Sequence, residues 1–131
     1  MDRITPVEEF PFLGASDANG YRVFPAELEN DELVFFHGTA DGHRRSIIDN
    51  GFKVIGSLPS VSFASSSSLA LRYACEARNA ASPDGCIIAV RFASIDKPGI
   101  KSESFGIHVY KFDEQPEIVG YCIIPAAYVF R

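Results

Sequence analysis

The sequence predicts an α+β fold, and three observations lead to this prediction. Segments typical of strands and of helices alternate up to about residue 79, whereas the segments that follow are typical of strands alone. The length of 131 residues suits one domain, and a hydrophobic content of 47% is enough to bury a core without disulfides or metal ions. A doubly wound parallel sheet is not expected, because it would need helices between the late strands as well.

Residues 1–30 are expected to form an irregular arm or a short hairpin that packs on the body of the domain, 31–131. Prolines and glycines interrupt this stretch too often for a long helix or strand. Four aromatic side chains are expected to anchor the arm, each contributing roughly 1.5–3 kcal/mol when fully buried. They are Phe10, Phe12, Tyr21 and Phe24.

The body begins with a strand and a helix. Leu33–His37 is an apolar run rich in β-forming residues, which predicts a buried strand that ends at Gly38. Asp41 is a candidate N-cap for the helix, two isoleucines supply its inward face, and Asn50–Gly51 is typical of a helix end.

A second strand and a second helix follow. Ser60–Ala64 alternates polar and apolar residues, which predicts a half-buried strand. Ser65–Ser68 offers several N-caps for a helix over Leu69–Asn79, where apolar residues recur at helical spacing. After a turn at Pro83–Gly85, three further strands are predicted. They are Cys86–Phe92, Gly106–Lys111 and Glu117–Ile124.

The charge balance limits the kinds of partner. Seventeen acidic and twelve basic side chains give a formal net charge of −5, so non-specific binding to nucleic acid is not expected. No apolar run approaches the roughly 20 residues that span a bilayer. Met1–Pro6 carries two opposite charges and no apolar stretch, so we expect a cytoplasmic protein, or a translocated effector without a recognisable signal peptide.

Cysteine and histidine spacing gives no metal signature. The three cysteines form neither a C-x-x-C pair nor an even disulfide set, so each is expected to be a reduced, buried apolar residue. The three histidines lack the spacing of zinc ligands, and no metal is expected. The sequence also lacks G-x-S-x-G, the P-loop, G-x-G-x-x-G and the EF-hand loop.

Polar residues at the ends of apolar strands are the candidate site residues. Each also has a structural explanation. His37 is compatible with a core histidine and Ser65–Ser68 with a helix cap. Likewise Tyr73 is compatible with a core aromatic and Glu117 with a solvated strand end. Only the combination of these residues, in this order, points to a function.

In combination, these residues resemble the ADP-ribosyltransferase family, particularly the branch that includes diphtheria toxin and the poly(ADP-ribose) polymerases. The resemblance covers about residues 33–130. It is carried by Phe35–Thr39 (FFHGT), Val61–Ala74 (VSFASSSSLALRYA) and Glu117–Tyr121 (EIVGY). It implies two small split antiparallel β-sheets with a few flanking helices, and an NAD-binding cleft between the sheets.

The activity that the resemblance implies is mono-ADP-ribosyl transfer or NAD glycohydrolysis. The protein would cleave the nicotinamide–ribose bond of NAD and pass ADP-ribose to an acceptor, expected to be a protein, as a toxin or effector does. NAD is then a substrate, and no metal is needed. Because the bond breaks through an oxocarbenium-like state, the site must place negative charge near the ribose.

Each matched residue then has an implied role. Glu117 and His37 would be the catalytic pair, with Glu117 stabilising the positive charge that develops on the ribose and His37 binding the adenosine ribose. The backbone of Gly38 would hold the nicotinamide carboxamide, which Ser68 or a neighbour would also contact, and Tyr73 would stack on the ring. The remaining residues expected to bind NAD are Thr39, Ser62 and Phe63.

Departures from the family pattern concern the second strand and the acidic motif. Ser62 stands where the most similar enzymes carry a second aromatic residue, so one side of the usual nicotinamide sandwich lacks its aromatic ring. Gln115, two residues before Glu117, is a candidate for positioning the acceptor substrate. Glu114 competes with Glu117 as the catalytic carboxylate. Arg44 and Arg45 are expected to lie on a solvated face.

Two rival functions stay open. One is a non-catalytic module that keeps the fold for binding ADP-ribose or a protein. The other is an NAD-dependent RNA 2'-phosphotransferase, which has the same fold and also begins its cleft with His-Gly-Thr. That activity needs several arginines and a second histidine to hold RNA phosphate, and His108 is distant from His37 in the sequence.

Overall fold

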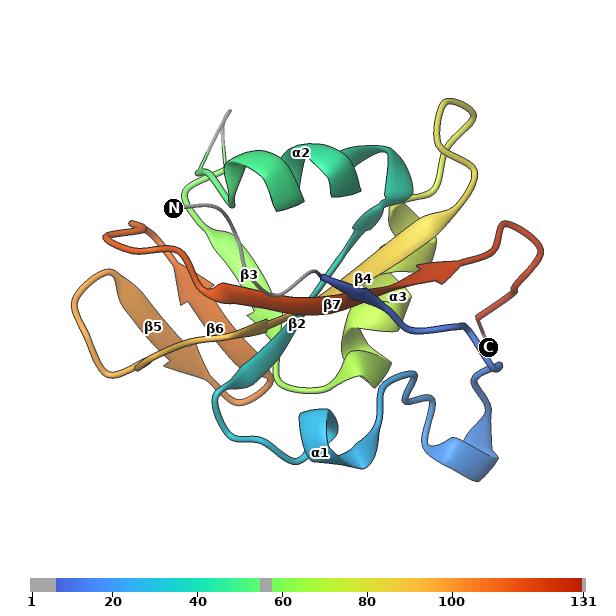
Figure 1. The fold of residues 1–131 in the computed structure, drawn as a ribbon, viewed down its shortest axis with the longest axis horizontal. Coiled ribbons are helices and arrows are strands. Elements are labelled where there is room, and N and C mark those ends of the chain that lie inside the picture. The colour runs from blue at the N-terminus through green and yellow to red at the C-terminus, as the bar shows by residue number, and fades with distance from the viewer. Residues whose placement is uncertain (1–6, 55–57, 131) are drawn as a thin grey trace.

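A computed structural model describes residues 7–54 and 58–130 of the chain. The strands are β1 (Glu8–Glu9), β2 (Val34–Ala40), β3 (Val61–Ala64), β4 (Gly85–Arg91), β5 (Ile100–Glu103), β6 (Gly106–Val109) and β7 (Glu117–Ile124). The helices are α1 (Ala26–Glu29), α2 (Arg44–Asn50) and α3 (Ser67–Ala77), with 3-10 turns at Asp17–Asn19 and Asp41–His43. This confirms the α+β class (Figure 1).

The strands form one mixed sheet in the order β1-β7-β4-β2-β3-β6-β5. All neighbours are antiparallel except β1 and β7, which run parallel. The junction between β2 and β3 is narrow, because Phe36 and Ala64 form its one register pair among the described residues. The two separate sheets expected from the sequence are therefore replaced by two antiparallel groups of strands that meet at this pair.

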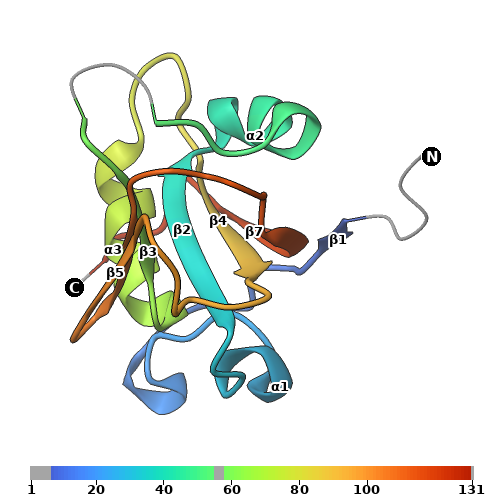
Figure 2. The same cartoon turned by 90° about the vertical axis from the view of Figure 1, so that its left-hand side faces the viewer.

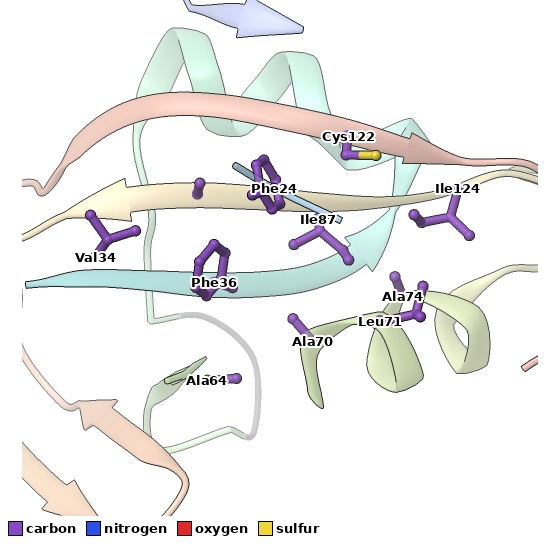
Figure 3. Close-up of a cluster of buried hydrophobic side chains, with 11 residues drawn as sticks. Phe24, Val34, Phe36, Ala64, Ala70, Leu71, Ala74, Ile87, Cys122 and Ile124 are labelled. Atoms are coloured by element: carbon purple, nitrogen blue, oxygen red, sulfur yellow. The ribbon is translucent and has the colours of Figure 1, made fainter. Parts of the chain in front are cut away.

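Side chains on the two faces of the sheet form two separate cores. On one face, Ala70, Leu71 and Ala74 of α3 belong to the same buried cluster as Val34 and Phe36 of β2 (Figures 2 and 3). On the other face, the isoleucines of α2 pack against a cluster that includes Phe35, Phe52, Phe63 and Ile88. Because side chains alternate between the two faces of a strand, even-numbered β2 residues face α3 and odd-numbered ones face α2.

Helix and strand ends differ in part from the prediction. β2 continues through Gly38 to Ala40, because it pairs with β4 along its whole length. α3 begins at Ser67, since the Ser66 hydroxyl caps the backbone N–H of Leu69. Asp41 does not cap α2: its side chain instead accepts a hydrogen bond from Arg44. β5 is an edge strand of mostly exposed residues that hydrophobic patterning did not predict.

The N-terminal arm lies along the sheet edge and against the start of α3. β1 adds to β7, and the ring of Phe24 is buried in the α3-side core with Phe10, Phe12 and Tyr21 partly buried around it. The N-terminal hexapeptide that bears on secretion lies outside the described residues. In the described parts of the chain, no helix is long and apolar enough to cross a membrane.

Candidate functional site

The candidate site lies where β3 diverges from β2. Hydrogen bonds to β4 come from odd-numbered β2 positions, as the flanking bonds Phe92 N–Leu33 O and Asp41 N–Asp84 O at 2.9 Å indicate. The peptide groups of Gly38 therefore point away from β4, toward β3. The ladder between β2 and β3 has already ended at Phe36, so Gly38 borders a gap in the hydrogen-bonded ladder. We call this region the β2–β3 opening and define it by His37, Gly38, Ser62, Tyr73 and His108.

His37 bridges this opening from β2. Its Nδ1 lies 2.9 Å from the carbonyl oxygen of Ser62. Because a carbonyl only accepts hydrogen bonds, Nδ1 carries the proton and Nε2 is left as an acceptor in the neutral ring. The imidazole packs edge-on against Phe52, with ring centroids 5.3 Å apart, and also contacts Phe63. His37 thus has a fixed orientation and tautomer at the opening.

The same packing makes His37 a source of acid sensitivity. Burial lowers the pKa of His37, although the bond to Ser62 partly opposes this and nearby His43 adds to it. As the pH falls, the unfolded chain, whose histidine has a pKa of about 6.5, takes up a proton on His37 before the folded chain does. Stability from neutral His37 is therefore complete above about pH 6.5 and is lost as the pH falls toward the lower folded-state pKa.

We expect the free energy of unfolding of the wild type to decrease as the pH is lowered through this window. In His37→Gln, the slope of this free energy against pH should be smaller. Urea unfolding above and below about pH 6.5 measures both slopes. His43→Gln, which removes the exposed neighbour that adds to this shift, should reduce the slope by less than His37→Gln does. Equal slopes in the wild type and His37→Gln would contradict the assignment.

Ser62 faces the opening from β3 and is held by both neighbouring strands. Its carbonyl binds His37, and its Oγ lies 2.9 Å from Nδ1 of His108 on β6. Ser62 and His108 are directly opposite each other in the β3–β6 register. His108 is a site residue that the sequence analysis dismissed, because only strand pairing brings it close to Ser62.

Tyr73 of α3 lies close to Gly38 of β2 at the site. The tyrosine is 51% exposed, and its Cβ lies 3.1 Å from the position that a Cβ on Gly38 would occupy. That position would also lie 2.2 Å from the Ala70 carbonyl oxygen, so the helix backbone rests directly on the strand. Because Gly38 has no side chain, α3 can pack directly on β2. The same absence would let a ligand approach the peptide groups of Gly38.

Three other predicted NAD contacts have different surroundings. Phe63 is 2% exposed and forms the centre of an aromatic cluster, so it is a core residue. Ser68 bonds the Ser66 hydroxyl and lines a separate cavity of about 410 Å³ with Tyr21 of the arm. Thr39 lies opposite Cys86 and is half-buried on the same face as His37.

Glu117 lies away from the residues that define the β2–β3 opening. Glu117 lies opposite Arg91, and Arg91 lies opposite Val34, so these three side chains are on the α3 face of the sheet. The His37 side chain is on the α2 face. The Glu117 carboxylate is 59% exposed and lies 3.5 Å from the Arg91 guanidinium. Three strand spacings, roughly 14 Å, separate β7 from β3 and Ser62.

Gln115, predicted to position the acceptor substrate, makes structural hydrogen bonds to the segment after α2. Its side-chain oxygen accepts the Phe52 N–H at 2.7 Å, and its Nε2 donates to the Phe52 carbonyl at 2.9 Å. Both halves of the amide are thereby used to hold the segment after α2. Glu114, the competing carboxylate, pairs with Lys97 at 3.6 Å. Both residues line a cavity of about 230 Å³ with Glu117, apart from His37.

Comparisons with protein-family models, with curated proteins and with solved structures found no match to this chain. The described residues contain no cluster of three or more histidine, cysteine or acidic side chains able to hold a metal ion. The β2–β3 opening therefore has to be interpreted from its own chemistry. It offers a peptide edge, an oriented imidazole, an exposed aromatic ring and a hydroxyl bonded to a second imidazole.

Proposed function

We propose that this chain is an ADP-ribosyltransferase-like protein that binds the nicotinamide-ribose end of NAD at the β2–β3 opening. The observation that supports the proposal most is the early end of the β2–β3 ladder, which leaves the Gly38 peptide edge beside His37, Ser62 and Tyr73. These residues belong to the segments that carry the family resemblance. The function proposed is one of binding, with NAD as the ligand.

The chemistry of nicotinamide suits these groups. A carboxamide presents both a donor and an acceptor, and a strand edge directed into an opening offers one acceptor and one donor in return. The flat pyridine ring gains from stacking on an aromatic side chain, and half of Tyr73 is accessible. Nε2 of His37 can accept a hydrogen bond from a ribose hydroxyl.

Cleavage of NAD, the activity expected from the resemblance, is not part of this proposal. It requires negative charge close to the nicotinamide ribose. Glu117 is too far from Ser62 to supply it, and its carboxylate is paired with Arg91. We therefore propose that the chain binds NAD and that Glu117 has no catalytic role. This function is closer to that of the non-catalytic module than to that of the transferase.

Isothermal titration with NAD tests this proposal. We expect Tyr73→Ala to weaken binding about tenfold, because removing one stacked ring costs roughly 0.5–1.5 kcal/mol beyond its buried area. Glu117→Gln is expected to leave the dissociation constant and any release of nicotinamide unchanged. Phe105→Ala removes another exposed aromatic, which lines the separate cavity with Ser68, and serves as the control. Absence of binding, or its loss in Glu117→Gln, would contradict the proposal.

An RNA 2'-phosphotransferase is a second candidate, favoured by one observation. The second histidine that such an activity needs is present at the opening, because His108 bonds Ser62. The net charge of −5 weighs against RNA as a partner. Transfer of the phosphate from an internally 2'-phosphorylated RNA to NAD, with loss of transfer in His108→Gln, would support this candidate over simple NAD binding.

A further inference from the structure

The β5 strand forms one edge of the sheet and has peptide groups available to a further strand (Figure 1). In the described part of the chain it pairs only with β6, and its residues 101–103 are exposed. The Tyr110 N–H donates to the Gly99 carbonyl at 2.7 Å. Antiparallel strands bond a given neighbour through every second residue, so the odd-numbered residues of β5 bond β6. The N–H and C=O groups of Ile100 and Ser102 therefore point to the open edge.

The side chains of this edge carry opposite charges at two alternate positions. Lys101 and Glu103 lie on the same face of β5 and form an ion pair of 3.9 Å, with 67% and 44% of their side chains exposed. A lone lysine on an edge strand opposes pairing with another chain. A lysine and a glutamate on either side of Ser102 are instead complementary to the same sequence running in the opposite direction. The edge therefore fits a second copy of itself.

The direction of the peptide groups restricts the register of such a pairing, because Ile100 and Ser102 have to meet outward-pointing residues of the second copy. A register centred on Ser102 sets Lys101 opposite Glu103 twice, once in each direction. Centres at Lys101 or at Glu103 would place like charges opposite each other, which is destabilising. A centre at Ile100 would place Pro98, which has no N–H, opposite Ser102. The register centred on Ser102 is therefore favoured by both charge and hydrogen bonding.

From this self-complementary edge we propose that two copies of the chain pair through antiparallel β5 strands, with Ser102 on the two-fold axis, and join their sheets into one. Lys101 and Glu103 then occupy non-hydrogen-bonded positions, where opposite side chains come closest. Each lysine lies between two glutamates, and the four charges alternate. One short strand from each copy forms a small interface, so the dimer is expected to be weak.

The proposed dimer leaves the β2–β3 opening accessible. Lys101 pairs with His108 on β6, and His108 pairs with Ser62 on β3, so two strand spacings, roughly 10 Å, separate β5 from the opening. Dimer formation and NAD binding are therefore independent, and the failure of one proposal does not affect the other.

The test is sedimentation velocity of the full chain over a concentration series up to about 1 mM, where even a weak dimer is populated. We expect the dimer fraction to rise with concentration. Glu103→Lys should weaken the dimer about tenfold, because two attractive cross-strand pairs become repulsive. Glu76→Lys is the matched control, since it makes the same change of charge in the exposed ion pair with Arg72 on α3 and should dimerise like the wild type.

Two further experiments test the register and the backbone pairing. Lys101→Glu should also weaken the dimer, but an equal mixture of Lys101→Glu and Glu103→Lys chains should restore it, because the acidic pair of one variant then faces the basic pair of the other. Ser102→Pro removes an N–H that points away from β6 and should abolish the dimer while the chain stays folded by circular dichroism. A chain that stays monomeric at every concentration would overturn the proposal. A dimer that persists in Glu103→Lys or Ser102→Pro, or a mixture that fails to restore it, would do so as well.

Discussion

Replacing Gly38 with alanine is expected to destabilise the protein by about 3 kcal/mol or more, or to prevent folding. A Cβ at this position would lie 2.2 Å from the carbonyl oxygen of Ala70 and 2.7 Å from the backbone nitrogen of Ala74. Both atoms belong to the backbone of α3, so no side-chain rotation relieves the contact. The helix would have to move off the sheet and open the core that it covers.

Urea unfolding measures this effect. Gly42→Ala is the matched control, because its added Cβ would lie 3.3 Å from atoms of the Ser82 side chain, which can adjust. We expect that variant to stay within about 1 kcal/mol of the wild type. A folded Gly38→Ala with the wild-type midpoint would contradict the close packing of α3 on β2.

Replacing Glu29 with alanine is expected to cost about 3 kcal/mol of unfolding free energy. The Glu29 carboxylate is 4% exposed, and it accepts hydrogen bonds from the Phe24 N–H and from the hydroxyl of fully buried Ser67. Arg22 lies 3.8 Å from it. Without the carboxylate, these buried donors lose their partner, and each unsatisfied donor costs roughly 1–3 kcal/mol.

Glu27→Ala provides the comparison, because it removes an exposed carboxylate from the same helix. It should change stability by less than about 0.5 kcal/mol. Thermal or urea unfolding of the two variants side by side gives the difference. Equal stability would mean that Glu29 does not hold the arm to the start of α3.

Local patterns predicted the elements well, because they depend on neighbours in the sequence. The strand at 117–124 is present with the predicted bounds, and one of the four consecutive serines caps α3. Position 38 shows the limit of such patterns. Glycine followed by polar residues is typical of a strand end, but pairing with β4 carries the strand on to Ala40.

Which residues come together at the site depends on the order of the strands in the sheet, and the pattern of residues along the sequence does not reveal this order. Glu117 was predicted from its place in a motif, yet β7 lies three strands away from β3. His108 lacks the spacing of a metal ligand and is distant from His37 in the sequence, so it was not predicted as a site residue. The β3–β6 register nevertheless places it opposite Ser62. One signal was available for it, since a histidine between two buried aliphatic residues of a strand must face the opposite side of the sheet from them.

Gln115 illustrates a further limit. A glutamine two residues before an acidic residue suggested substrate positioning, whereas its amide completes hydrogen bonds of the Phe52 backbone. The close approach of its side chain to Gly51, where the φ angle is +83°, depends on a contact between residues more than sixty positions apart. Tertiary contacts of this kind are invisible to motif comparison.

The most direct test of NAD binding at the β2–β3 opening is a titration followed in amide NMR spectra of the isotope-labelled chain. The account predicts that the largest shift changes on adding NAD fall on the amides of Gly38, Ser62 and Tyr73, and that they saturate with the dissociation constant found by calorimetry. Changes centred on Gln115 and Glu117, or spectra that do not change, would contradict it.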